Sequence, residues 1–124
     1  MQPDYEQHGI QRYSGGAKGR SRATAYDNLV FTVATAPGAN KSMAEQTAET
    51  LALLDKHLAD AGSSREHILT ATVYVTDINA KQEMDDVWCE WIGPPENWPQ
   101  RACVQTGLAA DTLVEITLVA ARAA

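Results

Sequence analysis

One run of apolar residues in the first third of the chain constrains the fold more than any other feature. Residues 29–34 read Leu-Val-Phe-Thr-Val-Ala, a nearly continuous and largely β-branched segment. Such a run is typical of a strand that is buried on both of its faces. A sheet that contains this strand is therefore expected to be covered on both of its faces.

Two helices are available to cover it. A long amphipathic helix is predicted to start at the Ser-x-x-Glu capping pattern of Ser42 and to end at Gly62. A shorter helix is expected to open at a second cap formed by Asn79 and Gln82, and to stop at the Gly-Pro-Pro of residues 93–95. Two helices of this size cover one face of a sheet, so the second face stays apolar and open.

The other strands follow from alternation and turn signals. They are expected at residues 10–13, 20–26, 69–75, 101–107 and 113–121. Together with residues 29–34 they give an α+β fold, a mixed sheet of about six strands with two helices packed on one face. The length of 124 residues suits one domain, residues 1–124. A chain this small would expose its second apolar face as a monomer, so this face is predicted to pack on other subunits.

Composition narrows the possible partners. Lys and Arg number 10 against 16 Asp and Glu, a net charge of −6, which argues against a nucleic-acid partner. No apolar run approaches the roughly 20 residues that span a bilayer, so no membrane partner is expected. Cys89 and Cys103 do not make a disulfide scaffold, which points to a reducing cytoplasm. The three histidines lack metal-ligand spacing, so no metal is expected.

Arg101, Cys103 and Glu115 are the candidate chemical group. Alternation puts Arg101 and Cys103 on one face of a strand, and Glu115 joins that face if the two closing strands pair as an antiparallel hairpin. A guanidinium suits a carboxylate ligand, a carboxylate can position water or take a proton, and a thiol beside an arginine can have a lowered pKa. The competing interpretation is structural: a cross-strand ion pair with a small core cysteine beside it.

The C-terminal third of the chain resembles a known family. Residues 101–104 (Arg-Ala-Cys-Val), 108–111 (Leu-Ala-Ala-Asp) and 113–116 (Leu-Val-Glu-Ile) resemble the signature of the Rid family, the reactive intermediate deaminases, also called YjgF-like proteins. Residues 28–31 (Asn-Leu-Val-Phe) resemble its second motif, and the likeness extends over residues 20–121. The resemblance implies a chorismate-mutase-like fold, a homotrimer with a central barrel, and ligand clefts between subunits.

The same resemblance implies an activity. The family typically hydrolyses 2-imino acids such as 2-iminobutanoate or 2-iminopropanoate, or their enamine tautomers, to 2-oxo acids and ammonia, with no cofactor. Carried over to this sequence, Arg101 would bind the carboxylate of a small-molecule substrate. Cys103 would line the cleft, and Glu115 would position the attacking water.

Four positions depart from the family pattern. Ala34 and Thr35 stand where Gly-Gln is usual, Arg20 stands where a tyrosine is usual, and Asp85 replaces an asparagine of the short helix. We include all four among the expected substrate-binding residues, since each would reshape the pocket. They also keep a second interpretation open, a non-catalytic trimer that binds small carboxylates or regulates another process.

Overall fold

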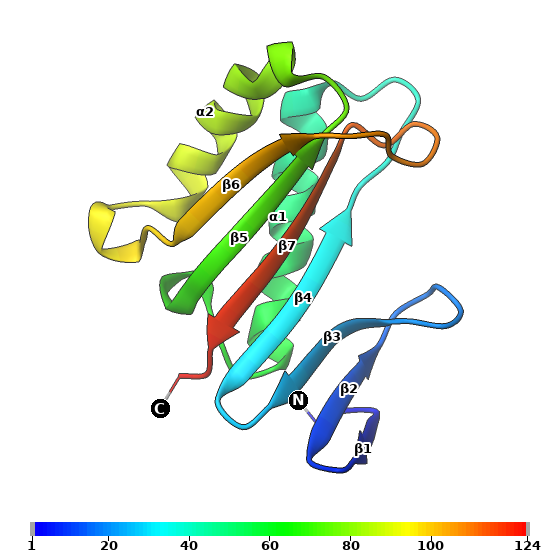
Figure 1. The fold of residues 1–124 in the computed structure, drawn as a ribbon, viewed down its shortest axis with the longest axis vertical. Coiled ribbons are helices and arrows are strands. Elements are labelled where there is room, and N and C mark those ends of the chain that lie inside the picture. The colour runs from blue at the N-terminus through cyan, green and yellow to red at the C-terminus, as the bar shows by residue number, and fades with distance from the viewer. Residues whose placement is uncertain (1, 124) are drawn as a thin grey trace.

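The computed structural model describes residues 2–123, in which four strands are followed by a helix, a strand, a second helix and two closing strands (Figure 1). The strands are β1 (Tyr5–Gln7), β2 (Ile10–Ser14), β3 (Ser21–Tyr26), β4 (Leu29–Thr35), β5 (Ile68–Val75), β6 (Gln100–Gln105) and β7 (Val114–Ala121). The α-helices are α1 (Met43–Asp60) and α2 (Lys81–Ile92). Single 3₁₀ turns occupy residues 65–67, 78–80 and 95–97.

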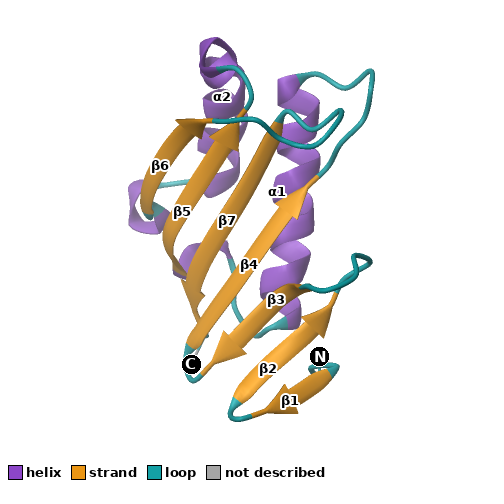
Figure 2. Ribbon diagram, turned by 45° about the vertical axis from the view of Figure 1, so that its right-hand side comes forward, coloured by secondary structure: helices purple, strands orange, loops and turns teal. Residues whose placement is uncertain are grey.

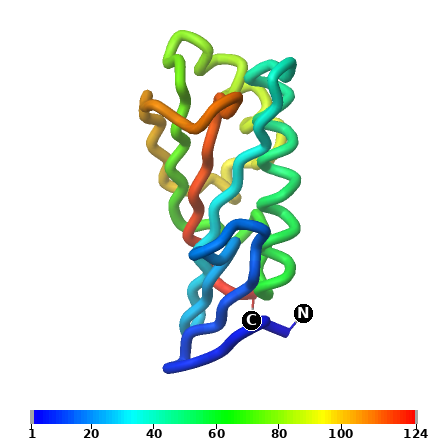
Figure 3. The backbone as a smooth tube through the Cα atoms, turned by 90° about the vertical axis from the view of Figure 1, so that its right-hand side faces the viewer, coloured from blue at the N-terminus to red at the C-terminus, as the bar shows by residue number. Residues whose placement is uncertain are grey.

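The strands form one mixed sheet in the order β1-β2-β3-β4-β7-β5-β6. All neighbours are antiparallel except β5 and β6, which run parallel. Both α-helices lie on the same side of this sheet, as the turned views make plain (Figures 2 and 3). The predicted α+β fold is confirmed, with seven strands in place of about six within residues 2–123. The additional strand, β1, is three exposed residues long and is too short to produce a recognisable alternation.

The two closing strands do not form the hairpin that the sequence led us to expect. β5 lies between β6 and β7, and it pairs with each of them. The chain leaves β6, crosses the end of β5 and returns as β7. This order cannot be read from alternation, because alternation reports the two faces of a strand and not its neighbours.

Local signals predicted α1 well. The Ser42 hydroxyl accepts a hydrogen bond from the Glu45 backbone N–H at 3.1 Å, and the Glu45 carboxylate accepts one from the Ser42 N–H at 2.9 Å. These bonds hold the pKa of Glu45 below its usual value. After the C-cap at Ala61, Gly62 takes a φ of +83°, a conformation that favours glycine.

The start of α2 differs from the prediction. Asn79 and Gln82 do not cap it. Instead, the Asp77 side chain accepts a hydrogen bond from the Asn79 N–H at 2.9 Å and caps the 3₁₀ turn that leads into the helix. Helix α2 then begins at Lys81 without a side-chain cap. Its end at Gly93 is as predicted, with a φ of +81°.

The core lies between the sheet and the two helices. Leu51, Leu54 and Leu58 of α1 and Met84 of α2 are fully buried against the inward side chains of the central strands. In β4 the residues that face the helices, Val30, Thr32 and Ala34, are all buried. The predicted burial of the strand at residues 29–34 is therefore confirmed for the face that packs against the helices.

The opposite face of the sheet, which we call the open face, has no cover from the chain itself. Leu29 and Phe31 of β4 are 37% and 40% exposed, and Val104 of β6 is 43% exposed. The run of residues 29–34 is thus buried on one side only within a single chain. Apolar side chains that are exposed on a strand surface in this way are typical of protein–protein interfaces. Among the described residues no helix is long and apolar enough to cross a membrane.

Candidate active site

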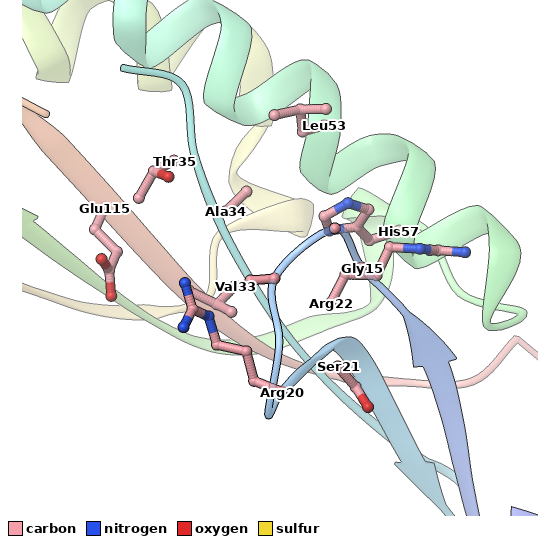
Figure 4. Close-up of a pocket in the computed structure, with 12 residues that line it drawn as sticks. Gly15, Arg20, Ser21, Arg22, Val33, Ala34, Thr35, Leu53, His57 and Glu115 are labelled. Atoms are coloured by element: carbon pink, nitrogen blue, oxygen red, sulfur yellow. The ribbon is translucent and has the colours of Figure 1, made fainter. Parts of the chain in front are cut away.

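A pocket of about 520 Å³ brings four of the expected site residues together (Figure 4). We call it the β4 pocket. Arg20, Ala34, Thr35 and Glu115 all line it, with the loop of residues 15–17 and part of α1 as further walls. It forms where β4 extends beyond β3, since β3 pairs with β4 only as far as Thr32. The edge of residues 33–35 on this side therefore has no strand neighbour, which leaves room for a ligand.

Glu115 enters this pocket from the open face of the sheet. It pairs with Thr35 of β4 on one side and with Tyr74 of β5 on the other. Its position along β7 is held by the loop before that strand, and that loop is anchored by the fully buried Gln46 of α1. The Gln46 amide N–H donates to the Asp111 carbonyl at 2.8 Å, and its amide oxygen accepts from the Leu113 N–H at 2.9 Å.

Gln46 was not among the expected site residues, although it fixes the loop that carries one of them. On sequence, a glutamine inside an amphipathic helix looks like part of the solvated face. Only the loop packed on top of α1 reveals that both ends of its amide are used. Burial without these partners would cost the free energy of an unsatisfied polar group.

A second arginine of the β4 pocket, Arg22, is already engaged. Its Nη1 lies 3.1 Å from the Asp60 carboxylate, its Nε donates to the Ser14 carbonyl at 2.9 Å, and its guanidinium lies over the Tyr13 ring at 5.7 Å. These contacts join β2, β3 and α1. Arg22 therefore acts as a structural side chain of the pocket wall.

His57 of α1 is a further pocket residue that sequence reasoning did not select. It is buried, and its Nδ1 lies 3.1 Å from the Thr32 hydroxyl. That hydroxyl donates to the Arg22 carbonyl at 2.8 Å, so the proton between Thr32 and His57 belongs to the histidine. Burial, together with the positive charge of Arg22, lowers the pKa of His57, and the ring is neutral at pH 7.

Arg101 lies elsewhere, at the β6 edge of the sheet beneath α2. Its Nη2 donates to the Asp85 carboxylate at 2.6 Å, and the guanidinium stacks over the Trp88 ring at 5.3 Å. The other Asp85 oxygen accepts from Lys81 at 2.5 Å. Burial raises the pKa of Asp85, but hydrogen bonds and charges from Lys81 and Arg101 outweigh this and hold it below the usual value. We call these three charged residues, Lys81, Asp85 and Arg101, the β6 clamp.

The β6 clamp and Glu115 lie on opposite faces of the sheet. Val73 of β5 pairs with both Cys103 and Ile116, so Cys103 shares the helix-covered face with Ile116. Glu115 is next to Ile116 along β7 and points the other way. The expectation that Glu115 shares a face with Arg101 is therefore wrong, and a cross-strand ion pair between them is wrong as well. Alternation was correct for each strand, and the error came from the assumed hairpin.

Cys103 does share the face of Arg101, but its chemistry differs from the expectation. The side chain is half-buried against the core, and this burial raises the pKa of its thiol. The charge of Arg101 acts in the opposite direction and is the weaker effect. The predicted lowering of the Cys103 pKa is thus wrong, because desolvation of the thiolate outweighs a cation that is already paired with Asp85.

The two cysteines should therefore differ in reactivity. Cys89 is exposed on α2, so we expect a thiol reagent to label Cys89 before Cys103 in the native protein at neutral pH. The Cys89→Ser variant should retain only the slow reaction. That slow reaction should go on accelerating at pH values where an ordinary cysteine has already levelled off. Mass spectrometry of timed samples measures both rates, and first labelling at Cys103 would contradict the burial argument.

No group of three or more His, Cys, Asp or Glu side chains that could hold a metal ion occurs within residues 2–123. The predicted site residues thus lie in two clusters, the β4 pocket with Glu115 and the β6 clamp with Cys103 beside it. The β4 pocket offers a carboxylate, and the β6 clamp offers a guanidinium that is held by Asp85.

Comparison with known proteins identifies the family of this chain. Residues 16–122 match the family described as Endoribonuclease L-PSP. A RutC family protein of Haemophilus influenzae is 33% identical over 114 residues, which are 90% of this chain and 97% of that protein. A 3-aminoacrylate deaminase, RutC of Acinetobacter baylyi, is 31% identical over 106 residues, 79% of this chain and 82% of the relative.

Solved structures give the same answer for the fold. The crystal structure of a YjgF family member from Neisseria meningitidis superimposes with a TM-score of 0.86 and is 33% identical, covering 95% of this chain and 99% of that one. The family match over residues 16–122 includes both helices and the strands that carry Arg101 and Glu115. The chain belongs to the Rid family of YjgF-like proteins.

Proposed function

We propose that this protein hydrolyses reactive 2-imino acids, or their enamine tautomers, to 2-oxo acids and ammonia in clefts between the subunits of a homotrimer. The observation that carries the proposal is the separation of two half-sites in one chain. Glu115 stands in a pocket on the open face, and Arg101 stands at the β6 edge under α2. Neither half completes a site alone, and a second copy of the chain supplies the missing half.

The open face supports this assembly. Its exposed side chains include Leu29, Phe31 and Val104, and a shallow groove runs over β3, β4 and β7 beside Phe31 and Val33. Glu115 is on the same face. Subunits that cover this apolar surface would therefore bring a neighbour's chain close to Glu115 and exclude water around it.

We expect light scattering to give a mass near three times the 13.4 kDa of one chain. The Phe31→Glu variant should dissociate, because association would place a new carboxylate in an apolar interface. Since Phe31 is 40% exposed in the single chain, the variant should keep its circular dichroism spectrum. A wild-type protein that stays monomeric at micromolar concentration would remove the shared cleft, and with it the proposed site.

The chemistry assigns one task to each half-site. The guanidinium of Arg101, held by Asp85 and Trp88, receives the substrate carboxylate and orients the imine carbon. Glu115 accepts a proton from a water molecule as the water oxygen attacks that carbon. Glu115 gives this proton to the nitrogen of the resulting carbinolamine, and the C–N bond breaks with its electron pair going to ammonia. The hydroxyl oxygen forms the carbonyl double bond of the 2-oxo acid, and its proton passes through Glu115 to water. These steps use only the protein's own groups and water.

Two further comparisons bear on the proposal. The A. baylyi relative is described as a deaminase of 3-aminoacrylate, an enamine, which is the substrate class proposed here. The family description as an endoribonuclease would require the chain to bind RNA, and its net charge of −6 opposes such binding. We place the activity in the cytoplasm, where the free thiols of Cys89 and Cys103 remain reduced.

The direct test generates several 2-imino acids in situ with an amino-acid oxidase and follows release of the 2-oxo acid. Addition of the protein should accelerate release above the spontaneous rate in proportion to its concentration. If the protein binds a 2-oxo acid such as 2-oxobutyrate in a calorimeter but accelerates no imine hydrolysis, the non-catalytic carboxylate-binding trimer replaces the enzyme.

A further inference from the structure

Arg20 stands out in the β4 pocket because its charge has no partner among the residues that the structure describes. Its guanidinium makes no ion pair or hydrogen bond with any residue from 2 to 123 that meets ordinary distance limits, although it lines the pocket with Glu115. The side chain extends along the pocket toward the end where Glu115 lies (Figure 4). Gly19, with a φ of +85°, turns the chain into β3 immediately before Arg20 and so sets the point from which this side chain leaves.

The other cations near the two half-sites are committed. Arg22 is bound to Asp60 at 3.1 Å and to the Ser14 carbonyl. Lys81 is bound to Asp85 at 2.5 Å. Arg101 shares that carboxylate, but one of its amino groups, Nη1, faces only the Met84 sulfur at 3.7 Å and retains donors for a ligand. Arg20 and Arg101 are thus the two guanidinium groups with hydrogen-bonding capacity to offer a substrate.

The charge of the assembled cleft agrees with a second acidic group on that substrate. Three cations, Arg20, Arg101 and Lys81, stand against the two carboxylates of Asp85 and Glu115, which leaves one positive charge. A protonated imine of a monocarboxylic acid is a neutral zwitterion and leaves this charge uncompensated. A protonated imine of a dicarboxylic acid carries one net negative charge and balances it.

We infer that Arg20 is a specificity-determining residue and that the substrates are 2-imino dicarboxylic acids, whose second carboxylate is bound by Arg20 while the first is bound by Arg101 of the neighbouring copy. The inference rests on the proposed function, because it needs the shared cleft. In this arrangement the substrate spans the cleft with one carboxylate at each end, and the imine carbon is held near Glu115.

The test compares ligands that differ only in the second carboxylate. Calorimetry with the assembled protein measures binding of 2-oxoglutarate against 2-oxopentanoate, and of 2-oxosuccinate against 2-oxobutyrate. Wild-type protein should prefer the dicarboxylic member of each pair. Because Arg20 makes a charge-assisted contact with the second carboxylate, Arg20→Gln should reduce that preference by about 10- to 100-fold.

Lys18→Gln is the matched control. Lys18 is exposed on the same loop and carries the same charge, but it does not line the pocket. Its removal should leave the preference for dicarboxylic acids within about twofold, as expected for a screened surface charge. Equal losses in Arg20→Gln and Lys18→Gln would assign the effect to the general field of the loop and would overturn the inference.

Rates of hydrolysis of the imines of glutamate and of 2-aminopentanoate complete the test, and the same preference should appear in kcat/KM. A wild-type protein without preference, an Arg20→Gln variant with an unchanged preference, or failure to bind either acid would each overturn the inference. A protein whose binding preference depends on Arg20 but which hydrolyses no imine would retain Arg20 as the group that selects dicarboxylic ligands, and would exclude the proposed enzymatic activity.

Discussion

Glu115→Gln should lower the rate of imine hydrolysis by about 10²- to 10⁴-fold, the contribution typical of a positioned proton-transfer group. Glutamine keeps the size of the side chain and its place between Thr35 and Tyr74, so the pocket should remain intact. What is lost is the group that takes the proton from water during attack on the imine carbon. The decrease should therefore appear mainly in kcat, with a smaller change in the affinity for 2-oxo acids measured by calorimetry.

A second glutamate provides the control for this result. Glu90 is exposed on α2 and belongs to neither half-site. Glu90→Gln removes the same charge from the protein and should leave hydrolysis unchanged. If Glu115→Gln hydrolyses imines as fast as Glu90→Gln does while both remain assembled, proton transfer by Glu115 is excluded and the proposed mechanism fails.

Arg101→Lys should weaken both binding and turnover, by about 10- to 100-fold in kcat/KM, because it removes charge-assisted hydrogen bonds to the substrate carboxylate. Lysine keeps the positive charge and can still pair with Asp85. Lysine lacks the planar guanidinium, which contacts Asp85 through Nη2 and leaves other N–H groups for a ligand. The ammonium of lysine also stacks less well on the Trp88 ring. The loss should appear in KM and in the calorimetric affinity together.

The chain contains a closely matched arginine for comparison. Arg65 pairs with Asp55 at 2.6 Å and lies over the Trp91 ring at 4.9 Å, which are nearly the same kinds of contact that Arg101 makes. Arg65 is outside both half-sites. Arg65→Lys should therefore reproduce any structural cost of the substitution, seen as a shift in Tm, without affecting hydrolysis. Equal activity losses in the two variants would mean that Arg101 acts only through stability.

Asp85 gives Arg101 different surroundings in this chain from those that are usual in the family. Where the family usually has an asparagine, this protein has a carboxylate that binds both Lys81 and Arg101. An ionised partner orients Arg101 more strongly than an amide would, but it also offsets part of the positive charge that a substrate carboxylate meets. With Arg20 in the facing pocket, the positive charge is distributed over both ends of the proposed cleft.

Short-range interactions determined the parts of the structure that the sequence predicted correctly. Helix α1 begins at Ser42 and is followed by Gly62 because a capping box and a positive-φ glycine act within a few residues of the chain. The inward set of β4, Val30, Thr32 and Ala34, follows from the two-residue period of a strand. The same period placed Arg101 and Cys103 together on one face of β6.

Contacts between distant segments decided the rest. The insertion of β5 between β6 and β7 put Glu115 on the face opposite Arg101, and no local pattern encodes which strand lies beside which. Burial against the core, and not the nearby arginine, set the direction of the Cys103 pKa shift. The ion pair between Arg22 and Asp60 likewise depends on how α1 packs on the sheet. The sequence alone determined most of the elements and the residue types of the proposed site, whereas the placement of Arg101 and Glu115 on opposite faces of the sheet arose from strand order, which is fixed by packing over the whole chain.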